Sequence, residues 1–178
     1  MSDKYKPISL KKVRTCTLLS RKSKVARDAL GAPFSGGSFS RFIESLPDIL
    51  AARDLKSVVS AMVTAREKDR PVVLGMGAHP IKAGLSPVII DLMENDVITA
   101  VAMNGACIIH DFELSLMGHT SEDVDVELCR GTFGMAEETG KGLNRAVKKG
   151  VKQGLGIGRA VGEHIRKSRA SFKQLSIL

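Results

Sequence analysis

The chain has 178 residues and a formal net charge of +8, and 43% of its residues are hydrophobic while 26% are charged. A length near that of one domain and this mixed composition exclude a largely disordered chain. No apolar stretch reaches the roughly 18 residues of a membrane-spanning helix, and no apolar signal-peptide core follows the basic N-terminus. We therefore expect a cytoplasmic protein with no membrane partner.

The three cysteines are Cys16, Cys107 and Cys129. They include no CxxC pair, and an odd number cannot all pair within one chain, so we expect reduced thiols. Cys107 is expected to be a small buried residue rather than a nucleophile.

The charge is unevenly distributed along the chain. Residues 1–30 carry a net +7, residues 31–140 carry −8 and residues 141–178 carry +9. Basic ends can bind nucleic acid or anionic lipid, or they can be solvated faces or a surface that meets the acidic middle of another subunit. Because no base-reading module is present and aromatic residues are only 4%, the second interpretation is favoured and a nucleic-acid partner is not expected.

The N-terminal part is predicted to be a basic arm over residues 1–38, irregular or with a short helix at most. From Ser40 apolar residues recur at helical spacing, and Pro47 is expected to divide that run. The spacing from Leu55 to Val63 predicts an amphipathic helix.

Two short apolar runs, 71–75 and 97–103, predict buried parallel strands. Each is followed by a glycine-containing loop and then a helix, at 88–94 and at 108–117. Ser86 is expected to cap the first of these helices, with Pro87 as its first residue. This order predicts an α/β fold with a parallel sheet, in which ligands sit at the carboxyl ends of the strands.

The remaining elements are mostly helical. The acidic segment 121–127 is expected to be exposed, and helices are predicted at 135–149 and from Ala160 onward. Gly154–Gly158 resembles a dinucleotide loop but does not follow a strand, so we expect a flexible connection. The apolar residues 175–178 predict an exposed apolar patch on a chain that stops inside a larger fold.

The two strand-end loops are the predicted cofactor site, because small residues let a phosphate or ribose approach the backbone amides. Tight turns with no ligand are the alternative. The predicted cofactor-binding residues are Gly75, Gly77, Ala78, His79, Asn104, Gly105 and Ala106.

A polar cluster follows the second loop. His110 and Glu113 share one helix face at i, i+3 spacing, with Asp111 beside them and His119 nearby. We predict an acid/base or substrate-orienting role for His110, Asp111 and Glu113, with structural capping as the alternative. Together with His79 these side chains could hold a divalent metal, but the spacing matches no strong motif, and no metal ligand is assigned.

Three consecutive segments carry a resemblance to a known family: VVLGMGAHPIKAGL, SPVIIDLMEND and VITAVAMNGACIIHDFEL. From Pro71 to Leu116 the chain resembles the deoxyhypusine synthases, in particular their divergent bacterial relatives. The resemblance implies a Rossmann-like sheet flanked by helices, with an NAD-binding region over 39–140. It also implies a basic, glycine-rich helical segment, 141–178, that leads into an absent C-terminal half.

The same resemblance implies a function. Family enzymes are homotetramers that use NAD to move the aminobutyl group of spermidine onto a lysine of a translation factor. His110 and Asp111 would face the reactive end of NAD. Ile109 and His110 stand where the family has acidic residues, and its catalytic lysine lies beyond Leu178, so this chain alone is expected to be inactive.

Two other functions remain open. One is an acid/base- or metal-dependent enzyme of the same fold that acts on a small amine or amide. The other is a non-catalytic assembly module whose basic ends bind an acidic partner.

Overall fold

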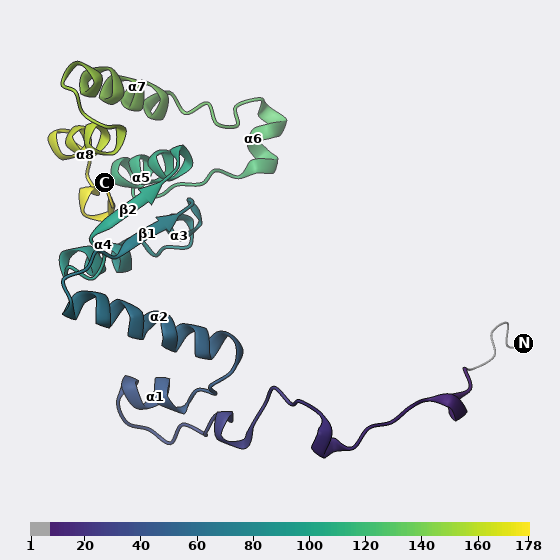
Figure 1. Cartoon of the computed structure of the whole chain (residues 1–178). Helices are drawn as coiled ribbons and strands as arrows, with labels where there is room; N and C mark the ends of the chain where they lie inside the picture. The colour runs from purple at the N-terminus through teal and green to yellow at the C-terminus, as the bar shows by residue number, and fades with distance from the viewer. Residues whose placement is uncertain (1–7) are drawn as a thin grey trace, which may run out of the picture. The chain divides into compact units, whose positions relative to one another are not determined.

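A computed structural model describes residues 8–178 of the chain (Figure 1). The fold is mixed α/β, mostly helical with one two-stranded parallel sheet. It consists of two compact units that divide after Ser60, inside helix α2 (Leu50–Glu67), whereas the sequence analysis placed its divisions after residues 38 and 140. None of the helices within residues 8–178 combines the length and the apolar character that crossing a membrane requires.

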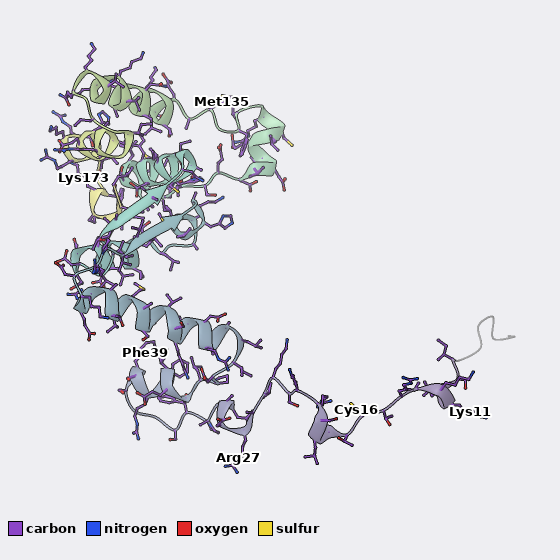
Figure 2. The ribbon with its side chains drawn as sticks, in the orientation of Figure 1. Lys11, Cys16, Arg27, Phe39, Met135 and Lys173 are labelled. Carbon is purple, nitrogen blue, oxygen red and sulfur yellow. The ribbon has the colours of Figure 1, made fainter. Side chains whose placement is uncertain are left out.

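The first unit begins with the basic arm. Three single 3₁₀ turns at Leu10–Lys12, Leu18–Ser20 and Arg27–Ala29 are separated by extended backbone, which confirms the predicted irregular segment from residue 8 on. Lys11, Cys16 and Arg27 lie along this arm in Figure 2.

Helix α1 and the part of α2 up to Ser60 complete the first unit. Helix α1 (Phe39–Ser45) starts at the cap Ser38, whose hydroxyl accepts a hydrogen bond from the Arg41 amide. It ends before Pro47, as predicted, because the residue preceding a proline is held out of the helical region. Helix α2 then covers the predicted amphipathic run and extends it at both ends.

The second unit contains the sheet. Strand β1 (Val73–Met76) pairs in parallel with β2 (Ala100–Met103), so that Val73 lies opposite Ala100. The chain between them forms a short helix α3 (His79–Lys82), which the sequence analysis did not predict, and helix α4 (Ser86–Glu94). Helix α5 (Gly105–Met117) follows β2. The predicted strand, helix, strand, helix order is confirmed, although both strands are shorter than expected.

The prediction that both strands are buried is wrong for one face of the sheet. Leu74 and Val101 pack on a core of Ile81, Ile89 and Cys107, whereas Val73 is 61% exposed and Ala100 is exposed as well. The physical reason is that the described helices of this unit cover one side of the sheet, whereas parallel sheets are usually covered on both faces.

The predicted cap of α4 is also wrong. Ser86 is the first residue of the helix rather than its cap, and Leu85 occupies the capping position without a side-chain hydrogen bond. Ser86 is 1% exposed, and its hydroxyl has no hydrogen-bond partner among the described residues. Pro87, expected as the first residue of the helix, is its second residue and lies in the first turn.

Three helices follow α5: α6 (Val124–Arg130), α7 (Glu137–Lys152) and α8 (Ile157–Lys167). The acidic segment is exposed as predicted, but part of it forms α6, which Figure 1 shows apart from the other helices of this unit. Helices α5, α7 and α8 pack against one another. The hydrophobic core that they share is formed by Phe112, Ala146, Val161 and Ile165.

The prediction that residues 175–178 expose an apolar patch is wrong. After a 3₁₀ turn at Lys173–Leu175, Ile177 is 6% exposed and packs in the core beneath the sheet, and Leu178 packs beside Val161. The segment is held there by hydrogen bonds to the buried Asp111.

Candidate functional site

The first predicted loop lies at the carboxyl end of β1, but Gly75 is not part of it. Gly75 sits inside the strand, opposite Ala102, so the prediction that it forms a loop is wrong. Gly77 and Ala78 make the connection, and His79 is already the first residue of α3. Gly77 and His79 are exposed, and Ala78 is half-buried.

Of the second predicted loop, only Asn104 lies outside a helix or strand. Asn104 caps α5, and its side-chain oxygen accepts a hydrogen bond from the Cys107 amide at 3.1 Å. Gly105 and Ala106 form the first turn of the helix rather than a loop, because this cap lets the helix begin directly after the strand.

The two strand ends meet at Asn104. The Asn104 Nδ2 atom lies 3.9 Å from the point where a Cβ atom on Gly77 would stand. The buried Cys107 thiol donates a hydrogen bond to the Met76 carbonyl at 3.5 Å, which joins the end of β1 to the first turn of α5. We call this exposed region, with Gly77, His79 and Asn104 to Ala106, the strand-end edge.

The strand-end edge has room and donors for a phosphate group. A Cβ atom on Gly105 would meet no atom within 4 Å, so no side chain covers the backbone at this residue. The amides of Gly105 and Ala106 belong to the first turn of α5, where a helix offers them no backbone acceptor and its dipole favours an anion. The residues present therefore fit a phosphate-bearing cofactor.

The structure brings His110 and Glu113 together with two threonines. The Thr120 hydroxyl donates a hydrogen bond to Glu113 Oε2 at 2.6 Å, and the Thr139 hydroxyl donates to Oε1 at 3.1 Å. The Nδ1 atom of His110 lies 2.8 Å from the Thr120 oxygen and 3.7 Å from Glu113 Oε2. We call these four residues the Glu113 network.

The hydrogen bonds of the network determine which ring nitrogen of His110 carries a proton. Thr120 has one hydroxyl proton, and it is directed to Glu113, so the Thr120 oxygen can only accept from His110. The His110 ring therefore carries a proton on Nδ1, and in its neutral form Nε2 is left as a proton acceptor. The side chains of His110 and Glu113 are 20% and 23% exposed, so both can be reached by a small solute.

Asp111 is not part of this network. It is fully buried, and its carboxylate accepts hydrogen bonds from the Ser176 hydroxyl at 2.6 Å and from the Ile177 amide at 2.7 Å. Burial raises the pKa of Asp111, and this effect exceeds the opposing effect of its hydrogen bonds. The structure thus places Asp111 in an anchoring position and does not bring it to His110 and Glu113.

Helix α5 contributes residues to both the Glu113 network and the strand-end edge, but these residues lie far apart along it. Glu113 follows Gly105 by eight residues, which is about 12 Å along the axis of α5. A ligand that touches both would have to extend along this helix. Among residues 8–178 no hydrogen bond or ion pair links His79 or His119 to the network, and no three His, Cys, Asp or Glu side chains gather as a metal site requires.

Two members of the Glu113 network were not predicted from the sequence. Thr120 follows α5 in a loop, and Thr139 lies on α7, twenty-six residues from Glu113. Neither has a sequence signal that separates it from an ordinary polar surface residue. The basic segment 141–178 was identified from its charge, but the groove that its side chains line along α7 was not predicted. The sequence signal for this groove is the absence of acidic residues between 139 and 162.

Comparisons of this chain with protein-family models, with curated proteins and with solved structures find no significant match.

Proposed function

We propose that the second unit is the NAD-binding region of a deoxyhypusine synthase-like protein, with a Rossmann-like arrangement around its two parallel strands. The observation that carries the proposal is the approach of Gly77 and Asn104 at the strand-end edge, where two adjacent parallel strands finish. This is the place at which open α/β sheets bind nucleotides. The resemblance of residues 71–116 to the family supports the same site.

Each residue of the edge has a distinct task in this proposal. Asn104 holds the first turn of α5 in place, and the Gly105 and Ala106 amides donate to a phosphate oxygen. Gly77 leaves the space that a bulkier side chain would occupy. His79 is exposed at the start of α3, where it can donate to the ribose or the phosphate.

The Glu113 network would hold the amine substrate. Each carboxylate oxygen of Glu113 accepts one threonine hydrogen bond and keeps a lone pair for an ammonium group. Such charge-assisted hydrogen bonds are stronger than neutral ones, which suits recognition of a polyamine. NAD, when bound, supplies a hydride acceptor for oxidation of the carbon next to a substrate nitrogen.

The protein is proposed to work as a homo-oligomer, by resemblance a tetramer. The exposed face of the sheet, which includes Val73 and Ala100, would be covered in such an assembly. A small amine is the proposed substrate, and a translation-factor lysine is the acceptor that the resemblance implies.

A second candidate function is acid/base chemistry on a small amine or amide without NAD. The observation that favours it is the protonation pattern of His110, whose Nδ1 atom faces Thr120 and Glu113 and whose Nε2 atom is left available as a general base. In this case substrate would bind at the Glu113 network and the strand-end edge would be structural.

Calorimetric titrations separate the two candidates. Under the first, NAD binds the wild-type chain, and Gly77→Val abolishes NAD binding while circular dichroism stays unchanged. Glu113→Gln would then weaken binding of a polyamine and leave NAD binding intact. A folded wild-type chain that binds the amine but not NAD would contradict the first candidate and favour the second.

A further inference from the structure

Helix α7 carries a line of basic side chains on its exposed surface. Together with Asn144 and the segment from Gly134 to Glu137, these side chains line an open groove of about 1010 Å³. All of them are exposed, whereas the opposite side of α7, with Ala146 and Gly150, is buried. We call these residues the α7 basic stripe: Lys141, Arg145, Lys148, Lys149 and Lys152.

The stripe has almost no compensating negative charge. Lys141 pairs with Glu137, one turn before it, but within residues 8–178 the other four basic side chains form no ion pair. The sequence explains this, because no aspartate or glutamate occurs between Thr139 and Gly162. Exposed helices usually mix charges of both signs, so this stripe is more than an ordinary solvated face.

The arrangement opposes folding rather than helping it. Arg145 is three residues from Lys148 and four from both Lys141 and Lys149, and like charges at these spacings destabilise a helix. Lys149 and Lys152 gain from the dipole in the last turn, but Arg145 and Lys148 do not. An anion bound in the groove would relieve this repulsion.

The charges of the stripe also act on a neighbouring histidine. His164 on α8 stacks near Phe112, with ring centroids 6.0 Å apart. Burial, and then the charges of Arg145 and Lys149, lower the pKa of His164. The positive field of the stripe therefore extends across the contact between α7 and α8.

We propose that the α7 basic stripe binds the phosphate backbone of a nucleic acid duplex without reading its base sequence. From Lys141 to Lys152 the stripe spans eleven residues, which is about 16 Å of helix. A duplex presents one negative charge per roughly 1.7 Å of its axis, so several phosphates fall within this length. A protein can be positioned on a duplex by contacts to the phosphate backbone alone, and such contacts need no base-reading module. A nucleic-acid partner was not expected from the sequence because such a module is absent from it.

The lining of the groove disfavours other anionic partners. It contains no aromatic side chain on which single-stranded bases could stack. Its apolar side chains are Met135 and Ala136, and Figure 2 shows Met135 on the segment that leads into α7. Two such residues give little to insert into a membrane, which binds amphipathic helices through a broad apolar face.

Fluorescence anisotropy with a labelled RNA duplex and a labelled DNA duplex tests the proposal, with salt varied between about 50 and 200 mM. The test variant combines Arg145→Gln, Lys148→Gln and Lys152→Gln, which are exposed and keep helix propensity. Its matched control removes the same charge from the basic arm by Lys11→Gln, Lys12→Gln and Arg14→Gln. We expect the α7 variant to lose about tenfold or more in affinity and to lower the salt slope by about 3, and we expect a smaller change in the control.

Several outcomes would overturn the proposal. A wild-type chain that binds neither duplex, or binds with a salt slope near zero, is one of them, and it requires no variant. Equal losses in the α7 variant and the arm variant would show that net charge, and not the stripe, carries binding. Stripe-dependent binding to anionic phosphatidylserine vesicles without binding to either duplex would assign the stripe to a membrane instead.

Discussion

The carboxylate of Asp111 accepts a hydrogen bond from the backbone amide of Ile177 at 2.7 Å, which ties the middle of α5 to the end of the chain. The same carboxylate accepts from the Ser176 hydroxyl and, at 3.4 Å, from the Leu178 amide. A buried donor that loses its acceptor destabilises the folded state, because it has given up its hydrogen bonds to water and gains none in return. Asp111 is therefore a structural anchor for the segment that places Ile177 in the core.

Replacement of this anchor should destabilise the second unit. We expect Asp111→Ala to lower the free energy of unfolding by about 2–4 kcal/mol, because it leaves the buried Ile177 amide and the half-buried Ser176 hydroxyl without their acceptor. The measurement is urea denaturation followed by circular dichroism. Asp125→Ala, on the exposed helix α6, is the matched control and should change stability by less than about 0.5 kcal/mol. Equal stability of the two variants would contradict the anchoring role.

The pH dependence of stability gives a second prediction for Asp111. Burial raises the pKa of Asp111 above its ordinary value of 3.8, so the folded state holds this proton at pH values where the unfolded state has lost it. The stabilisation linked to this proton is complete below pH 3.8 and is lost as pH rises through the folded pKa. Compared with Asp111→Asn, the wild type should therefore lose stability as pH rises from about 4. A difference in unfolding free energy that is constant with pH would contradict this prediction.

The contact between α7 and α8 depends on a residue without a side chain. A Cβ atom on Gly150 would overlap the Ala160 side chain, whereas one on Gly140 would meet nothing within 4 Å. We expect Gly150→Ala to destabilise the chain by about 1–3 kcal/mol through overpacking. Gly140→Ala should stabilise it by up to about 1 kcal/mol, since alanine favours the helix. Thermal unfolding of both variants checks the prediction, and a stabilising Gly150→Ala would refute the packing that we describe.

The chain alone should not transfer an aminobutyl group. A lysine that forms an imine is desolvated or crowded by another cation, whereas Lys82, near the strand-end edge, is exposed on α3. We expect that incubation with NAD, labelled spermidine and a translation factor leaves the factor unlabelled. Borohydride should trap no spermidine-derived adduct on the chain. A trapped adduct at Lys82 would show that the chain is a self-sufficient enzyme.

Local patterns were enough to predict several elements of the fold. The apolar runs after Pro71 and before Asn104 are short and bounded by turn-forming residues, and both are strands. Pro47 divides two helices because its ring clashes with the backbone of Leu46 and keeps that residue extended. Helix α6 was missed because seven residues hold too little periodicity, although Asp123 does cap it by accepting from the Val126 amide.

Features that depend on distant partners could not be predicted. The i, i+3 spacing of His110 and Glu113 predicted their proximity, since a helix brings such residues together. Asp111 was grouped with them because it is adjacent in sequence, but its partner Ile177 lies sixty-six residues away. The direction in which a helical side chain points depends on what packs against that helix, and for Asp111 this is the last segment of the chain.

Binding of NAD at the strand-end edge can be followed by the amide chemical shifts of the chain during an NAD titration. We expect the shifts of Gly77, Asn104, Gly105 and Ala106 to move together and to saturate. We also expect that Gly105→Val removes these changes while Gly140→Val, equally open in the structure, retains them. An absence of shift changes, or changes confined to the α7 basic stripe, whose positive charges can also attract the phosphates of NAD, would show that NAD does not bind at the strand-end edge.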